Sequence, residues 1–409
     1  MYFHFDFTNY FRMIRLAWNE RNPSVRRTYL FVLLVSVPIV STFHAICFFL
    51  DGILFPGLWR TEIRTPVFVV GHARSGTTLA HRLMSKDHGR FSSFRLYELY
   101  FPSLLQKKLI RWFFTIDRRL LGGAIEKRVR AWEDRHYAAV RAVHWMGLTE
   151  PEEDDLVFYY SCASGFWITK MPYMGSLDFY HVDRWPERRR RRLMRFYQNC
   201  VRRQLYLNGG DKIHLSKNPV FAGRVEALIE TFPDACIVVP IRNPNETIPS
   251  LLKLVAGGWK RLGWDRERVN RCLRIMADQS FHTYTYPLEV LARHPRTPQA
   301  IVDYRELSAD PAAATEGIYD RLGLPMSEEY RRLLAAEGRR ERSHVSGHSY
   351  SLAEFGLEAD EIHRRLSDLF ERYQWSAGPA AGTGDGAPAE ARESEPSDTN
   401  AGGAGQGAG

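Results

Sequence analysis

The sequence predicts an α/β protein with three layers, in which helices cover both faces of a central parallel sheet. Short apolar runs rich in valine and isoleucine occur at widely separated places, as expected of strands buried on both faces. Amphipathic helical patterns separate these runs, which is typical of parallel strands joined by crossover helices. The chain of 409 residues is long enough for one large domain of this kind with helical insertions.

The N-terminal part differs from the rest in composition. Residues 1–29 combine aromatic and basic side chains, and residues 30–50 form an apolar stretch of about membrane-spanning length, interrupted by Pro38. The stretch starts too far into the chain for a standard signal peptide. It could span a membrane as one helix, lie in the membrane interface, or pack on the domain as a hydrophobic hairpin. We expect residues 1–60 to form a hydrophobic, helical, membrane-associated segment.

A strand, a tight turn and a helix start follow at residues 67–79. Gly71 and Gly76 bracket the turn and allow the backbone to approach a ligand closely. Thr77 and Thr78 then open a helix, whose first N–H groups have no partner within the helix and form the positive end of its dipole, which favours an anion. Two glycines five residues apart, followed by two hydroxyl residues, have the spacing of a phosphate loop. The pattern therefore predicts a P-loop-like domain.

One part of an ordinary phosphate loop is missing. Thr77 stands where nucleotide triphosphatases carry the lysine that reaches the β- and γ-phosphates, so the sequence argues against ordinary ATP or GTP chemistry. A cation, Arg74, lies inside the loop instead. The loop suits a phosphate that carries one further small anionic group.

The segment Gly71-His-Ala-Arg-Ser-Gly-Thr-Thr-Leu79 after a strand resembles the 5′-phosphosulfate loop of sulfotransferases. Enzymes of that superfamily use 3′-phosphoadenosine 5′-phosphosulfate (PAPS) as sulfuryl donor, and the resemblance extends over roughly residues 62–375. It implies sulfuryl transfer to an acceptor hydroxyl without a metal ion. It also implies donor contacts from the loop residues Gly71, Arg74, Ser75, Gly76, Thr77 and Thr78.

Two later strands supply further cations to the same sheet. Lys217 ends the strand at residues 212–217, where α/β sheets bind ligands, and the resemblance implies that it contacts the transferring group. Arg242 ends the strand at residues 235–241, and Ser250 follows in the next helix. This pair resembles the 3′-phosphate site of PAPS-dependent enzymes, since an arginine fork matches a phosphate. Two phosphate sites on one sheet imply a nucleotide phosphorylated at both ends.

The general base is harder to identify. Many cytosolic sulfotransferases place a histidine base two residues after the lysine, but that position is Pro219 here. Several members of the superfamily place an acidic residue soon after the first helix, which makes Glu98 the predicted base. Arg74 and Lys217 are the predicted catalytic cations. A His-x-Tyr-x-Leu loop resembles the ending of one bacterial-type sulfotransferase group and implies that His348 contacts the nucleotide.

Two charged clusters invite other interpretations. The acidic run at residues 150–155 could bind a metal or a cationic substrate, but a solvated helix start is favoured because acidic residues and proline suit a first turn. The basic run at residues 187–192 could contact nucleic acid, lipid headgroups or a sulfated glycan. We favour an exposed helix face and no nucleic-acid partner, since no nucleic-acid-binding motif accompanies it.

The sequence thus predicts a membrane-associated segment at residues 1–60, a sulfotransferase domain at residues 61–375 and a disordered tail at residues 376–409. The tail consists of glycine, alanine, serine, proline and acidic residues and cannot form a core. The five cysteines are scattered without metal-binding spacing and fit a reducing compartment, so we expect the domain to face the cytoplasm. The net charge of +9 predicts an anionic partner.

Membrane attachment suggests a lipid or lipid-linked glycan as acceptor, and the oligomeric state stays open. Two alternatives compete with the sulfotransferase hypothesis. The first is a kinase-like phosphotransferase, which would depend on magnesium. The second is a non-catalytic, membrane-bound scaffold that binds a nucleotide without turnover.

Overall fold

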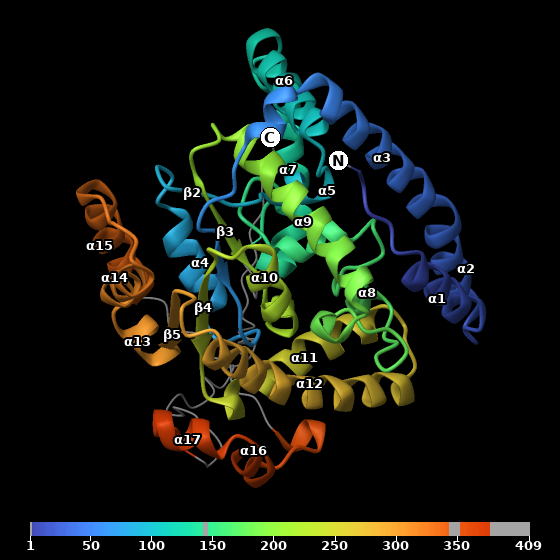
Figure 1. Cartoon of the computed structure of the whole chain (residues 1–409). Coiled ribbons are helices and arrows are strands. Elements are labelled where there is room, and N and C mark those ends of the chain that lie inside the picture. The colour runs from blue at the N-terminus through green and yellow to red at the C-terminus, as the bar shows by residue number, and fades with distance from the viewer. Residues whose placement is uncertain (1, 142–145, 343–351, 377–409) are drawn as a thin grey trace, which may run out of the picture.

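The computed structural model describes residues 2–141, 146–342 and 352–376, and it confirms the predicted fold class (Figure 1). Five parallel strands form one sheet in the order β2-β3-β1-β4-β5. Their bounds are β1 Val67–Val69, β2 Phe91–Ser92, β3 Ile213–Lys217, β4 Cys236–Ile241 and β5 Gln299–Asp303. The sequence pattern predicted β1, β3 and β4, whereas β2 is only two residues long.

The register of the sheet brings three strand ends together. Val69 of the central strand β1 lies opposite Lys217 of β3 on one side and Val238 of β4 on the other. Because the strands are parallel, their carboxyl ends meet at one edge, where the residues after β1 form the phosphate loop. The sheet therefore positions the loop, Lys217 and Arg242 at the same edge.

Alternate residues of β1 belong to two different hydrophobic cores. Val67 and Val69 pack with helices on one face, and Phe68 and Val70 pack with helices on the other. The first core includes residues of α4 Thr77–Ser85, α14 Pro311–Leu322 and α15 Glu328–Arg342. The second includes residues of α9 Glu187–Leu207, α10 Val225–Thr231, α11 Pro244–Arg261 and α12 Arg266–Arg293. This is the three-layer arrangement that fully apolar strands require.

Most of the remaining chain is helical, as the periodicity predicted. The insertion between β2 and β3 contains α5 Leu96–Tyr100, α6 Leu104–Leu120, α7 Ala124–Arg141 and α8 Phe166–Lys170, followed by α9. The C-terminal part contains α13 Tyr304–Ala309, α16 Ala359–Arg365 and α17 Ser367–Tyr373. Helix α14 is capped at both ends: the Asp310 side chain accepts from the first turn, and Gly323 ends the helix in a left-handed conformation.

The N-terminal segment forms α1 Phe7–Trp18, α2 Pro23–Phe31 and α3 Val37–Leu54. A π-turn at Val32–Ser36 joins α2 to α3, so the helix is continuous from Pro23 to Leu54 and is long and apolar enough to cross a membrane. Pro38 lies two residues after the π-turn, and its ring and missing N–H disturb regular α-helical bonding. Residues of all three helices share one hydrophobic core with the sheet, so apolar packing continues across residue 60.

Candidate active site

The phosphate loop needs glycine at both ends of its turn. Gly71 has φ +123°, and a Cβ atom there would lie 2.9 Å from the carbonyl oxygen of Pro240 on β4. Gly76 has φ +95°, and a Cβ atom there would lie 2.7 Å from the ring of Tyr304. Both positions combine a left-handed backbone with a close neighbour, so a side chain at either would be strained. The turn is therefore pressed against the two neighbouring elements of the sheet edge.

The loop hydroxyls have different surroundings. Ser75 is fully buried, and its Oγ lies 2.6 Å from the carbonyl oxygen of His72 and 2.8 Å from that of Pro240. Its hydroxyl thus holds the loop to β4. Gly76 is the N-cap of α4, and Thr77 and Thr78 occupy the first helical positions. Amide groups at such a helix start point at any anion that the loop holds.

Arg74 joins the loop to the second predicted anion site. Its backbone adopts a left-handed conformation with φ +72°. Its Nε donates to the Oγ of Ser250, at 3.1 Å. Ser250 lies in α11, the helix that starts directly after β4. The structure therefore brings the two predicted phosphate sites into direct contact.

Arg242 lies at the start of that same segment. Its guanidinium donates to the Glu246 carboxylate and lies over the ring of Tyr304, 4.4 Å from the ring centroid. The same tyrosine ring approaches Gly76 of the loop. The backbone carbonyl of Arg242 accepts a hydrogen bond from the hydroxyl of Tyr284, at 2.7 Å. Arg242 is thus oriented by its neighbours and is linked to the loop through one aromatic ring.

Lys217 is buried at the end of β3 beside two carboxylates. Its Nζ lies 2.9 Å from Oε1 of Glu153 and 3.6 Å from Oε1 of Glu152. Burial alone would lower the pKa of Lys217, but Glu153 and Glu152 outweigh burial and raise the pKa above its ordinary value. Lys217 therefore carries a positive charge at neutral pH.

A mostly apolar cavity of about 440 Å³ lies beside the loop. Ala73, Glu152 and Glu153 contribute to its wall, and apolar side chains of α8, of α11 and of the segments 174–180 and 219–220 form much of the remainder. His72 also lines it, with Nε2 at 3.0 Å from Oγ of Ser280. Burial lowers the pKa of His72 to about 4, so the ring is neutral at physiological pH. The cavity size is typical of a site for a small molecule or for part of a larger one.

Comparison with known proteins decides the family. The profile of the sulfotransferase family matches residues 66–328. The chain belongs to the sulfotransferase family. This finding confirms the family predicted from the loop and the enzymatic nature of the protein, and it counts against both the kinase-like and the scaffold alternatives.

Relatives of this sulfotransferase are found in mycobacteria. Two are the proteins named omega-hydroxy-beta-dihydromenaquinone-9 sulfotransferase Stf3 from Mycobacterium bovis and Mycobacterium tuberculosis. Each is 25% identical to this chain over 323 residues, which cover 75% of this chain and 74% of the relative.

Solved structures show the same fold. Sulfotransferase STF1 from Mycobacterium tuberculosis H37Rv has a TM-score of 0.64 at 19% identity, and the match covers 89% of this chain and 94% of the STF1 chain. Sulfotransferase STF9 from Mycobacterium avium has a TM-score of 0.62 at 17% identity, and the match covers 88% of this chain and 95% of the STF9 chain.

The structure corrects the interpretation of the acidic run in this sulfotransferase. Glu152 is 3% exposed, and Asp154 and Asp155 are fully buried, so the run is not a solvated helix start. Asp154 accepts from the hydroxyl of Tyr197 and pairs with His214 of β3. The run faces the sheet because it supplies carboxylates to buried partners from distant segments, and no local pattern reports such partners.

Within the described ranges, no cluster of three or more histidine, cysteine, aspartate or glutamate residues has an arrangement that could hold a metal ion.

The predicted base Glu98 lies in α5, apart from the residues that line the cavity. It is fully buried and accepts from the backbone N–H of Arg95 at 3.0 Å, from Arg111 at 3.0 Å and from Gln204 at 2.8 Å. Burial alone would raise the pKa of Glu98, but Lys107, the Arg95 N–H and Arg111 lower it overall. Glu98 is therefore an ionised carboxylate with several fixed partners.

The other predicted site residues divide into two groups. The loop, Lys217, Arg242 and Ser250 gather at one edge of the sheet, as the strand order requires. His348 lies outside the described residues. Sequence reasoning missed His72 and Glu152 as cavity residues. The sequence offered only their positions as a clue: His72 lies inside the phosphate loop, and Glu152 lies within the acidic run.

Proposed function

We propose that this sulfotransferase transfers the sulfuryl group of PAPS to the hydroxyl of a lipid. The observation that carries the proposal is the apolar cavity between the phosphate loop and the pair formed by Lys217 and its carboxylates. A lipid alcohol can place its hydroxyl there while its apolar chain contacts the walls. The mycobacterial relatives are named for a hydroxylated menaquinone, which is also a lipid.

The residues present fit a donor that is phosphorylated at both ends. Gly71, Ser75, Gly76, Thr77 and Thr78 form the loop for the 5′-phosphosulfate. Arg74 reaches from this loop to Ser250, which with Arg242 would hold the 3′-phosphate, so one adenosine can bridge the two sites. The guanidinium of Arg242 pairs with the Glu246 carboxylate, so a bound 3′-phosphate would share or replace this partner.

The reaction is an in-line displacement at sulfur. The acceptor oxygen forms a bond to sulfur while the bond from sulfur to the 5′-phosphate oxygen breaks, and adenosine 3′,5′-bisphosphate leaves. Negative charge develops on the leaving phosphate, where Lys217 and Arg74 stabilise it most in the transition state. The acceptor proton passes to a carboxylate. The mechanism needs no metal ion, because no triphosphate charge has to be neutralised.

Two carboxylates compete as the base, and substitution distinguishes them. Glu152 lines the cavity next to Lys217, whereas Glu98 is held by Arg111 and Gln204. We expect Glu152→Gln to lower kcat by about a hundredfold, as for loss of a general base, with little change in the affinity for adenosine 3′,5′-bisphosphate. Single-turnover kinetics and calorimetry measure the two quantities.

Glu98→Gln is the matched comparison. Because the folded-state pKa of Glu98 is depressed, its carboxylate stabilises the fold above its unfolded pKa of about 4.3, and this contribution is lost as the pH falls through the lower folded value. The variant should therefore show a reduced Tm at neutral pH and a smaller difference in acid. A hundredfold slower kcat at unchanged Tm, with normal turnover by Glu152→Gln, would instead identify Glu98 as the base.

The acceptor class is tested with radiolabelled PAPS. The full chain is incubated with a lipid alcohol, such as an ω-hydroxylated isoprenoid quinone, and separately with glycans and phenols. We expect label in the lipid fraction. Label only in glycans or phenols would refute the lipid acceptor while leaving sulfuryl transfer intact, and no label from PAPS in any acceptor would count against the donor assignment.

We also propose that the protein is attached to a membrane with its domain on the cytoplasmic side. The apolar helix Pro23–Leu54 supports attachment. The cysteines of the described residues are free thiols, which fits a reducing compartment. Digestion of the domain by a protease added to intact cells from the outside would exclude the cytoplasmic side.

A further inference from the structure

The helix Pro23–Leu54 has a polar side that is fastened to the domain. The Asp51 carboxylate accepts from the Ser103 hydroxyl and from two backbone N–H groups at the start of α6, at 2.7 to 2.9 Å. It also pairs with Arg203 of α9 at 2.7 Å, and both side chains are fully buried. Nearer the middle of the helix, Ser41 donates to the backbone carbonyl of Tyr160 at 2.7 Å. These bonds hold the C-terminal half of the helix along the surface of the domain.

The opposite side of this helix is apolar and exposed. Only 28% of the most apolar 18-residue stretch of this helix is buried. Helix α1, which packs beside it, adds three aromatic rings at helical spacing. The exposed side chains are Phe7, Phe11 and Trp18 of α1, and Phe31, Leu34, Ile39, Phe43, Ile46, Phe49 and Ile53 of the long helix. We call these ten residues the apolar face, and its size is beyond what single exposed hydrophobic residues on a soluble protein explain.

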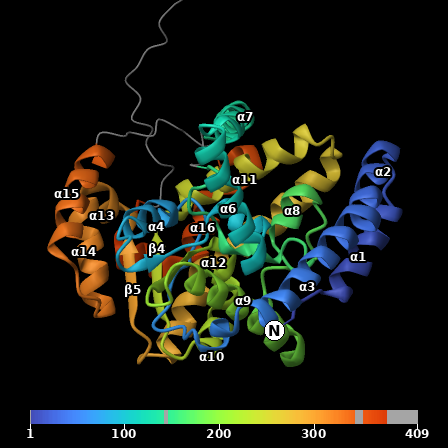
Figure 2. The same cartoon turned by 90° about the horizontal axis from the view of Figure 1, so that it is seen from above.

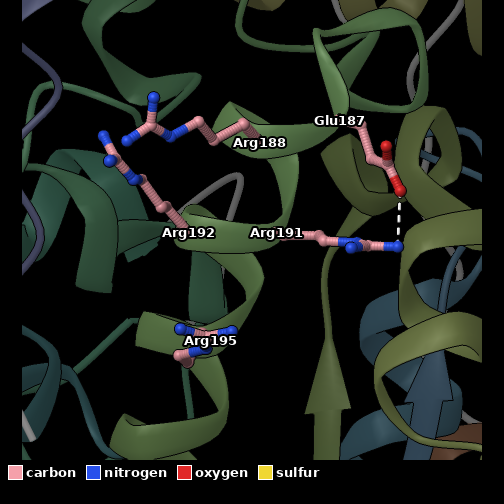
Figure 3. Close-up of a pocket in the computed structure, with 5 residues that line it drawn as sticks. All are labelled: Glu187, Arg188, Arg191, Arg192 and Arg195. Carbon is pink, nitrogen blue, oxygen red and sulfur yellow. Dashed lines mark ion pairs between the residues drawn. The ribbon is translucent and has the colours of Figure 1, made fainter.

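A cluster of arginines borders this face. Arg188, Arg192 and Arg195 are exposed near the start of α9, and Figure 3 shows Arg188 and Arg192 extending in the same direction while Arg191 turns to Glu187. Arg189, from the same turn, pairs with Asp6, the N-cap of α1, at 2.7 Å. The arginine cluster is therefore fixed beside the N-terminal helices.

Arg192 connects this cluster to an apolar groove. It lines the arginine-rich pocket of about 270 Å³ and also a groove of about 620 Å³. The groove runs between residues 2–10 and the part of α3 from Pro38 to Ala45, and most of its lining is apolar. An apolar groove with a guanidinium at its end matches a phospholipid, whose acyl chain and phosphate have the same polarity pattern.

We propose that the chain docks flat on an anionic phospholipid bilayer through the apolar face, with Arg188, Arg192 and Arg195 on the lipid phosphates. Crossing the bilayer would separate Asp51 from Arg203 and leave each charge buried without its partner, which is strongly unfavourable. A helix with one fastened polar side and one apolar side instead lies in the plane of the interface. The basic border supplies the attraction to anionic lipid.

Docking in this orientation also serves the proposed lipid acceptor, on which this step of the argument rests. Tyr173 donates to Glu20, which follows α1, at 2.6 Å. Met174 and Leu177, from the same loop, line the acceptor cavity. The end of α1 therefore contacts the loop that forms part of the cavity wall, and we expect a lipid alcohol to enter from this side.

Flotation of the purified full chain with preformed vesicles tests the docking. We expect binding to phosphatidylcholine vesicles that contain phosphatidylglycerol, weaker binding to pure phosphatidylcholine, and a loss of about tenfold or more for the triple variant Arg188→Ala, Arg192→Ala, Arg195→Ala. The matched control replaces Arg332, Arg339 and Arg340 by alanine. These arginines belong to α15, which lies on the side of the molecule opposite to α1, α2 and α3 (Figure 2). Equal losses in both variants, or none in the first, would overturn the proposal.

A second measurement separates lying flat from spanning. Single cysteines are introduced at Phe31 or Ile53, which are exposed and about 33 Å apart along the helix, and are labelled with a fluorophore. The native cysteines of the described residues are buried, so the label goes to the new thiol. A quencher outside the vesicles should reach both labels equally. If the quencher reached the label at one position only, the helix would span the bilayer. If both labels were shielded although the protein did not bind vesicles, the apolar face would be covered by self-association. Either result would contradict the proposal. Neither readout depends on turnover, so the lipid acceptor can fail independently.

Discussion

Replacing Arg242 by alanine is expected to weaken the binding of adenosine 3′,5′-bisphosphate by about thirty- to several-hundredfold. Loss of a charge-assisted arginine–phosphate pair costs about 2–4 kcal/mol, and the partly exposed position of this side chain favours the lower end. The guanidinium is oriented by the ring of Tyr304, so little order has to be gained on binding. Isothermal titration calorimetry measures the affinity.

The design contains its own controls. Adenosine 5′-monophosphate lacks the 3′-phosphate, so its affinity should hardly change in the Arg242→Ala variant. Arg261→Ala, in the last turn of the same helix α11, removes an exposed arginine and should leave both affinities near those of the original protein. If Arg242→Ala weakened both nucleotides equally, Arg242 would not be reading the 3′-phosphate.

Replacing Lys217 by alanine is expected to lower kcat by about a hundred- to a thousandfold. The raised pKa keeps Lys217 charged, and the β3 register holds it beside the loop, where charge develops on the leaving phosphate. Removing one fixed donor to such a charge has an effect of this size. Nucleotide affinity should fall much less than kcat, because the interaction strengthens only in the transition state. Single-turnover transfer from radiolabelled PAPS measures the rate.

This variant also leaves Glu153 without its partner at 2.9 Å, which could destabilise the fold. The double variant Lys217→Ala, Glu153→Gln removes that unpaired charge, and Lys217→Arg keeps the cation. Recovery of kcat in the double variant would show that Lys217 acts only on stability. Partial recovery in Lys217→Arg, with none in the double variant, is the expected pattern.

Much of the fold and half of the site could be predicted from local sequence. The strand at residues 67–70 is apolar on both faces, and Gly71 and Gly76 are demanded by backbone angles and close neighbours that a short motif already implies. The caps of α14 at Asp310 and Gly323 are equally local. Lys217 and Arg242 could be placed at one edge because parallel strands align their carboxyl ends.

The rest depended on contacts between distant segments. The contact of Arg74 with Ser250 joins residues 176 positions apart, and the acidic run is buried because Lys217, His214 and other remote groups meet it. The carboxylates that line the cavity beside Lys217 are Glu152 and Glu153, whereas the local pattern pointed to Glu98.

By itself, the sequence determined that this protein has a parallel α/β sheet with a phosphosulfate-type loop and an apolar N-terminal helix, because backbone conformation and apolar periodicity are local properties. Only the tertiary structure decided which carboxylates face the cavity and which side of the long helix faces the domain. The physical reason is that burial of a charge depends on its partner, and here the partners of Asp51 and Lys217 lie far away in the chain.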